Sequence, residues 1–198
     1  EKTQKELLFI VGEAVEARSK ETGCHVKRVA ILCALLATKL GLEEPFIEAI
    51  RLAAPLHDLG KIAIPEHILH KPGKLIGNDW DIMQTHAQIG ADILRKSTVS
   101  VSKLASRLAL YHHENWDGTG YPEGLKGENI PIEARIMAVV DVFDALGSKR
   151  CYKEPWSEDQ IKSFIIAEKN KKFDAALIDI IIDNFDEFTE IRAQFPDI

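Results

Sequence analysis

The stretch IEARIMAVVDVFDAL, residues 132–146, decides the fold that this sequence predicts. It is apolar almost all the way round at helical period, so we expect a helix buried at the centre of the molecule. Asp141 interrupts the apolar run, and a buried carboxylate is costly unless it is paired or binds a metal. A structural ion pair with Arg135 or another cation is the alternative explanation for Asp141.

The segments on either side also repeat at helical period, and none alternates cleanly enough to predict a strand. We expect helices over residues 1–18, 24–40, 44–58, 79–96, 100–114, 157–169 and 175–195, with a short helical turn at 65–69. Gly41 should end the second of these helices, and Asn78 and Ser157 are predicted N-caps. Residues 115–131 hold four glycines and two prolines and should be irregular. The predicted fold is all-α, a single compact domain of residues 1–198 with seven to eight helices.

The bulk composition limits the class of protein. With 198 residues, 45% of them hydrophobic and 28% charged, the chain is typical of a soluble globular protein. The longest apolar run, residues 29–37, is about half of what a membrane span needs, and no signal peptide is visible, so we expect a cytoplasmic protein. Three cysteines without metal-type spacing agree with a reducing compartment. The net charge of -6 argues against binding of nucleic-acid polymers.

Histidines and carboxylates occur together at several places in the chain. His57 and Asp58 are adjacent at a predicted helix end, and His112 and His113 precede the irregular segment. Neutral imidazoles and carboxylates are the ligands that hold two or three divalent cations close together. The sequence therefore predicts a polynuclear metal site.

Each of these features alone also has an ordinary explanation. His57 and Asp58 fit a helix C-terminus, where a histidine favours the helix dipole. His86 shares a predicted apolar face with three isoleucines and fits a hydrogen-bonded core histidine. Glu21 and His25, four residues apart, fit an exposed helical pair. The metal hypothesis depends on all of them occurring in one chain.

Several motifs together resemble the HD-GYP family. They are HDLGKIAIP at residues 57–65, KPG at 71–73, His86, HHE at 112–114, DGTGYP at 117–122 and DVFDAL at 141–146, followed by Arg150, Tyr152 and Lys153. The resemblance covers roughly residues 7–190. It implies an all-helical phosphohydrolase of the HD type that hydrolyses cyclic dinucleotides, chiefly cyclic di-GMP, at a centre of two or three metals. Iron is the expected metal and manganese the second candidate.

The resemblance also implies roles for individual residues. The metal ligands would be Glu21, His25, His57, Asp58, His86, His112, His113 and Asp141. Asp58 and Lys61 would be catalytic, with Asp58 bridging two metals and helping to hold the attacking hydroxide. The substrate would be bound by Lys61, Tyr121, Arg150 and Lys153. Without the resemblance, Arg150 and Lys153 fit a solvated helix C-terminus. Gly147 departs from the threonine that is more usual in the family.

Alternatives to hydrolysis of cyclic di-GMP remain open. The substrate could instead be the mixed cyclic GMP-AMP or another phosphate ester, and a non-catalytic receptor for the dinucleotide is the rival from another class. Because the chain opens on Glu1 rather than Met, we expect residues 1–20 to continue a helix from an upstream receiver or sensor domain. The oligomeric state cannot be predicted from these features.

Overall fold

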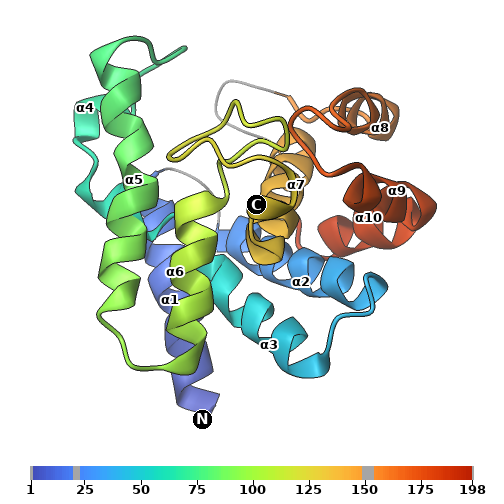
Figure 1. Cartoon of the computed structure of the whole chain (residues 1–198), viewed down its shortest axis with the longest axis horizontal. Coiled ribbons are helices and arrows are strands. Elements are labelled where there is room, and N and C mark those ends of the chain that lie inside the picture. Colours follow the sequence, from blue (N-terminus) through green and yellow to red (C-terminus); the bar gives the residue numbers. More distant parts are fainter. Residues whose placement is uncertain (1, 20–22, 149–153, 198) are drawn as a thin grey trace.

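The computed structural model describes residues 2–19, 23–148 and 154–197 (Figure 1). Within these ranges it is built of α-helices and short 3₁₀ helices, with one isolated β-bridge and no strand. The helices are α1 (Lys2–Arg18), α2 (Gly23–Lys39), α3 (Glu44–Ala53), η1 (Ala54–Leu56), η2 (Leu59–Ala63), α4 (Glu66–Leu69), α5 (Asn78–Arg95), α6 (Ser100–Tyr111), η3 (Gly127–Asn129), α7 (Ile132–Gly147), α8 (Glu158–Ala167), α9 (Ala175–Asp183) and α10 (Phe185–Gln194). The all-α prediction is confirmed, with ten α-helices described where seven to eight were expected.

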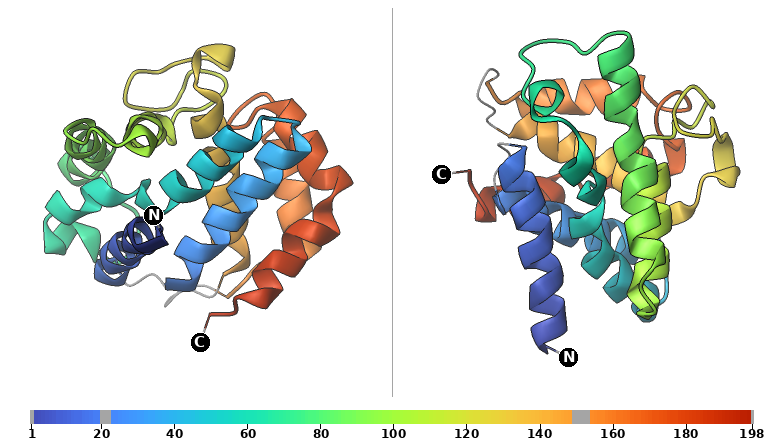
Figure 2. Two further views of the ribbon diagram at one scale, coloured as in Figure 1. Left: turned by 90° about the horizontal axis from the view of Figure 1, so that it is seen from below. Right: turned by 90° about the vertical axis from the view of Figure 1, so that its left-hand side faces the viewer.

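Helix α7 lies at the centre, as its apolar sequence predicts. It packs against α2, α6, α8 and α9. Val139, Val140 and Phe143 are fully buried in the main hydrophobic core. In Figure 1, α5 and α6 lie side by side on one side of α7, and α8, α9 and α10 lie on the other. Figure 2 shows α1 running along the outside of the bundle, next to η2.

Because of Pro55, the helix that was expected to reach residue 58 ends earlier. Helix α3 ends at Ala53, and the 3₁₀ turns η1 and η2 follow it. A proline has no N–H to donate and its ring crowds the preceding turn, so the α-helix cannot continue regularly through it. His57 and Asp58 therefore lie at the junction of two tight 3₁₀ turns.

The last predicted helix is divided into two. Helix α9 ends at Asp183 and α10 begins at Phe185, with Asn184 between them at φ -121° and ψ 26°. The Asn184 side chain donates a hydrogen bond to the carbonyl oxygen of Ile180. An asparagine side chain competes in this way for backbone groups and so favours a break over a continuous helix.

The apolar face predicted for α5 is not the buried one. Ile93 is 39% exposed, whereas His86, Gly90 and the alanines beside them are buried. A Cβ atom on Gly60 would lie 1.8 Å from the carbonyl oxygen of His86, so η2 and α5 approach each other at backbone distance. The small residues of α5 are buried because only they permit this approach, which brings His86 next to Asp58.

The predicted helix ends are mostly correct. Gly41 has φ 71° after α2, and Ser157 forms a capping box with Gln160 at the start of α8. Asn78 is instead the first residue of α5, and the capping position belongs to Gly77, at φ 56°. No described helix has the length and apolar character needed to cross a bilayer.

Candidate metal centre

Four side chains converge where η2, α5 and the end of α6 meet. They are Asp58, His86, His112 and His113, and one ligand atom of each lies within 4.8 Å of the others. Asp58 Oδ1 is 3.2 Å from His86 Nε2 and 3.6 Å from His112 Nε2. The Nε2 atoms of His86 and His113 are 3.1 Å apart. We call these residues the first cluster.

A second cluster adjoins the first. Its members are Glu16 on α1, His25 on α2 and His57, whose ligand atoms also lie within 4.8 Å of one another. Asp141 completes it from α7, because its Oδ1 atom is 3.5 Å from His25 Nε2 and 3.9 Å from His57 Nε2. The 3.2 Å distance from His57 Nε2 to Asp58 Oδ2 joins the two clusters.

Three of the imidazole rings are each held in a fixed orientation by a backbone carbonyl group. The Nδ1 atoms of His57, His86 and His112 lie 2.8, 2.6 and 2.9 Å from the carbonyl oxygen three residues earlier in the chain. When Nδ1 carries the proton and donates it to the carbonyl, Nε2 is left as an acceptor that points into the centre. This arrangement orients metal-binding histidines, because the second ring nitrogen fixes both tautomer and ring direction.

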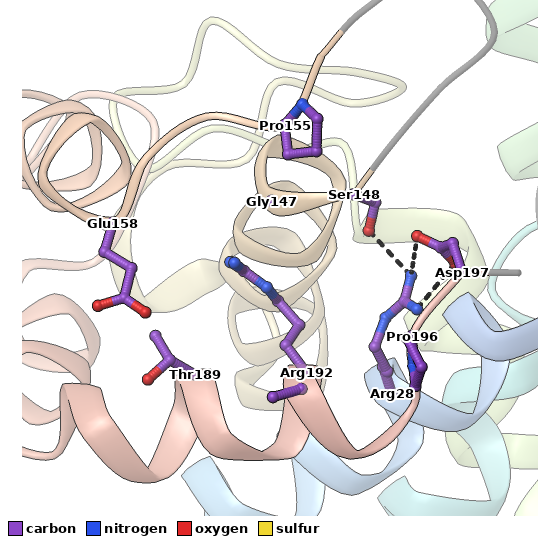
Figure 3. A pocket seen from close by; sticks show the side chains of 10 residues that line it. Arg28, Gly147, Ser148, Pro155, Glu158, Thr189, Arg192, Pro196 and Asp197 are labelled. Atoms are coloured by element: carbon purple, nitrogen blue, oxygen red, sulfur yellow. Dashed lines mark hydrogen bonds and ion pairs between the residues drawn. The ribbon is translucent and has the colours of Figure 1, made fainter.

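His25 is oriented by a carboxylate instead. Its Nδ1 atom lies 2.8 Å from Asp144 Oδ2. Asp144 is fully buried and also accepts hydrogen bonds from Arg28, at 2.7 Å from Nε and 3.0 Å from Nη2. Arg28 in turn donates to the carbonyl oxygen of Phe195. It also donates to Asp197 near the C-terminus (Figure 3). A buried series of charged groups therefore lies behind His25.

A pocket of about 330 Å³ opens beside this series, between the end of α7, α8 and α10. Figure 3 shows the Arg192 side chain reaching across it toward Gly147. A Cβ atom on Gly147 would lie 2.0 Å from Arg192 Cζ, so no larger residue fits there while the guanidinium keeps this position. The guanidinium is the far end of a flexible side chain, so a larger residue at position 147 would displace Arg192 from this position.

The two clusters contain buried polar atoms that have no hydrogen-bond partner in the described part of the chain. These atoms are both carboxylate oxygens of Glu16, Nε2 of His57, Oδ1 of Asp58 and Nε2 of His112. Such atoms are rare in folded proteins because desolvation without a compensating bond is costly. All of them face a neighbouring ligand atom within a few ångströms. Divalent cations would supply the missing partners, so the residues present fit a metal centre.

The charges of the centre agree with metal binding. Despite the burial of Asp58, the positive charges of Lys61 and His57 hold its pKa well below the usual range. Burial lowers the pKa of His112, and burial together with the neighbouring imidazoles holds the pKa of His113 well below its usual range. Burial opposes the charged form of His57, but Asp58 and Asp141 outweigh it and raise the pKa to about 10 in the cation-free protein. Ionised Asp58 beside neutral His112 and His113 is the ligand state that divalent cations need, whereas His57 has to lose a proton when a cation binds.

Comparison with known proteins identifies the family. A family model described as HD domain matches residues 5–177. The chain belongs to the HD domain family. The predicted resemblance to its HD-GYP branch is confirmed by the relatives and structures that match.

The matching relatives of this HD domain carry names of phosphodiesterases. The 3'3'-cGAMP-specific phosphodiesterase 2 of Vibrio cholerae is 50% identical over 98% of this chain and 37% of its own length. The cyclic di-GMP phosphodiesterase response regulator RpfG of Xanthomonas campestris is 42% identical over 98% of this chain and 52% of its own. The HD domain described here thus spans between about a third and a half of these relatives.

A solved structure has the same fold. The crystal structure of a cyclic GMP-AMP-specific phosphodiesterase from V. cholerae superposes with a TM-score of 0.72 at 20% identity, covering 98% of this chain and 54% of the other. At this level of identity the likeness shows the fold of the HD domain alone.

Most of the residues predicted for the site meet in the HD domain, and three could not be placed. Glu21, Arg150 and Lys153 lie outside the described residues. The ion pair considered between Asp141 and Arg135 is not formed, because Arg135 binds Asp174 at 2.8 Å. Asp141 was expected to be buried in the core. Its side chain is instead 25% exposed and faces the metal centre.

Lys61 and Tyr121, for which a substrate-binding role was predicted, lie next to residues of the first cluster. Lys61 Nζ is 2.6 Å from Asp58 Oδ2. The Tyr121 ring stacks on His113, with ring centroids 4.8 Å apart, and meets Trp80 edge to face. Burial raises the pKa of the Tyr121 hydroxyl, so this group stays protonated at neutral pH and can donate a hydrogen bond.

The roles of two residues that support the centre, Glu114 and Glu16, were not predicted from the sequence. Glu114 is buried and accepts hydrogen bonds from the backbone N–H groups of residues 123, 124 and 125, which holds the irregular segment in place. Glu16 was missed although it follows Gly12 by four residues on one helical face. A Cβ atom on Gly12 would lie 2.4 Å from the carbonyl oxygen of Pro55, so α1 approaches η1 closely at this point. A glycine on a buried helix face was the available signal.

Proposed function

We propose that this chain is a metal-dependent phosphodiesterase that hydrolyses a cyclic dinucleotide. The observation that carries the proposal is the convergence of Asp58, His86, His112 and His113, in which Asp58 Oδ1 and His112 Nε2 are buried without a hydrogen-bond partner among the described residues. Family membership and the names of the relatives support the reaction class. A receptor that only binds the dinucleotide does not need such a centre.

The first cluster and the second cluster would hold two or three divalent cations. When bound, such cations lower the pKa of water and neutralise phosphate charge, which is the chemistry that attack on a phosphodiester needs. Asp58 is central because its two carboxylate oxygens face opposite ways, Oδ1 toward His86 and Oδ2 toward His57. We infer that this carboxylate would be a ligand shared by the two clusters, which agrees with the bridging role that the HD-GYP resemblance implies. Mixed imidazole and carboxylate ligands favour iron, with manganese as the second candidate.

The surrounding residues would bind and orient the substrate. Lys61 lies beside Asp58, where its ammonium group can place positive charge on a non-bridging phosphate oxygen. Tyr121 closes the side next to His113 and offers a ring for stacking and a hydroxyl for hydrogen bonding. Arg150 and Lys153 are proposed to hold the second phosphate, where a guanidinium can bind bidentately.

Cyclic di-GMP and cyclic GMP-AMP are the two substrate candidates. The HD-GYP resemblance favours cyclic di-GMP. A specific observation favours cyclic GMP-AMP as the second candidate, since the relative with 50% identity is named as specific for 3'3'-cGAMP. We also propose that an upstream receiver or sensor domain regulates the reaction, because the chain corresponds to only part of its relatives.

The test is a product assay on protein reconstituted anaerobically with Fe²⁺ or Mn²⁺. Each dinucleotide is incubated with the protein and its linear products are separated by chromatography. Asp58→Ala should abolish turnover of whichever substrate is cleaved and leave the helical circular dichroism unchanged. Asp92→Ala, at an exposed ion pair with Arg95, is the matched control and should remain active. Tight binding of either dinucleotide without any product from the metal-loaded protein would replace the proposal by a receptor function.

A further inference from the structure

Glu16 is not among the metal ligands that the HD-GYP resemblance implies, but its surroundings in the second cluster point to a role as a ligand. Glu16 is 1% exposed, and neither of its carboxylate oxygens has a hydrogen-bond partner among the described residues. A carboxylate that served only the packing of α1 would be expected to have a donor within reach. Glu16 has ligand atoms of two histidines as neighbours instead.

The two histidines near Glu16 each have one ring nitrogen engaged by a group outside the metal centre. His25 Nδ1 is occupied by Asp144, and His57 Nδ1 is occupied by the carbonyl oxygen of Ala54. Each ring therefore has only Nε2 left to bind something, and Nε2 of His57 has no hydrogen-bond partner. One oxygen of Glu16 and a ring nitrogen of each histidine lie within 4.8 Å of one another. Two imidazoles and a carboxylate are a common ligand set for a divalent transition metal.

The packing of α1 places Glu16 at this position. Gly12 lies one helical turn before Glu16, so the two residues share a face. Because Gly12 has no side chain, α1 contacts the backbone of η1 directly. A Cβ atom on Gly12 would lie 2.4 Å from the carbonyl oxygen of Pro55. This close contact brings the next turn of α1 over His57. The packing of α1 therefore fixes the position of Glu16, which is not a mobile residue at the surface.

We propose that Glu16 is a direct metal ligand, which binds a divalent cation together with His25 and His57. Asp141 lies 3.5 Å from His25 and can complete the coordination from α7. The proposal deepens the proposed function, since it concerns the same metal centre. It differs from the set implied by the HD-GYP resemblance, in which Glu21 supplies the extra carboxylate.

The test counts metals directly and needs no substrate. The chain and its Glu16→Gln, Glu21→Gln and Glu6→Gln variants are reconstituted anaerobically with Fe²⁺, desalted and analysed for bound iron. Glu16→Gln should bind one equivalent fewer, or bind it at least about 100-fold more weakly, since removal of even an outer partner of a ligand costs roughly 10- to 100-fold. Glu6→Gln, at an exposed position on the same helix, should bind as the parent does. Loss from Glu16→Gln supports the proposal whether or not Glu21→Gln also loses metal.

A stability measurement separates a ligand from a packing residue. Glu16→Gln removes a buried unpaired carboxylate, so the metal-free variant should unfold at the same temperature as the metal-free parent or at a higher one. The rise in unfolding temperature on adding Fe²⁺ should be smaller in the variant. An unchanged iron count and an unchanged iron-induced rise for Glu16→Gln would overturn the proposal. Because neither measurement uses turnover, failure of the phosphodiesterase assay would leave this result standing, and the reverse also holds.

Discussion

Asp144→Ala tests whether the buried charges behind His25 stabilise the fold. Asp144 is fully buried and accepts two hydrogen bonds from Arg28, which is itself only 2% exposed. Removing one partner of a buried ion pair costs about 3–5 kcal/mol, because the other charge remains desolvated. Arg28 keeps its bonds to Phe195 and Asp197, which limits the loss to about 3 kcal/mol at the lower end of that range.

Urea denaturation of the metal-free protein, followed by circular dichroism, measures this loss. With a slope of about 2 kcal/mol per molar urea, the midpoint should fall by about 1.5 M. Asp92→Ala removes an exposed ion pair instead and should cost less than about 1 kcal/mol. The double variant Arg28→Met with Asp144→Ala should be less destabilised than the sum of the single changes, because no unpaired charge is left. A midpoint for Asp144→Ala equal to that of Asp92→Ala would refute the argument.

Three further outcomes are expected. Gly60→Ala should destabilise the protein by about 1–3 kcal/mol in thermal unfolding, since its Cβ would overlap the carbonyl oxygen of His86; an unchanged unfolding temperature would contradict the close packing of η2 on α5. Glu114→Ala should speed hydrogen exchange at the amides of residues 123–125 while leaving α7 protected. Equal protection of these amides in the variant and the parent would show that the Glu114 carboxylate does not hold this segment. Chelation of the reconstituted protein should lower its unfolding temperature without loss of helical circular dichroism, whereas loss of the helical signal would mean that the metals are needed for folding.

The central helix and most of the first cluster could be predicted from the sequence because their signals are local. An apolar stretch that covers every face of a helix has only one favourable place, the interior, and α7 is found there. His112 and His113 stand next to each other, and their pairing with Asp58 follows once the motifs are recognised. Such features need no knowledge of which helices pack together.

Other features depend on tertiary packing and were predicted wrongly or not at all. The buried face of α5 is determined by the close approach of Gly60, which requires a glycine and alanines on α5. Hydrophobic periodicity gives more weight to isoleucines than to these small residues, and so it predicts a different buried face. The break at Asn184 has neither a proline nor a glycine to signal it. Glu16 reaches His57 only because α1 packs on η1, which no spacing within α1 reveals.

The series His25–Asp144–Arg28–Asp197 has a consequence for the order in which the centre is assembled during synthesis. The first cluster uses residues between positions 58 and 113, whereas the second cluster needs α7 for Asp141 and for the carboxylate that orients His25. Arg28 reaches its last partner 169 residues further along the chain. On the ribosome, the groups of the first cluster are therefore all present long before the surroundings of His25 are complete, and a nascent chain would offer one half of the centre to metal well ahead of the other.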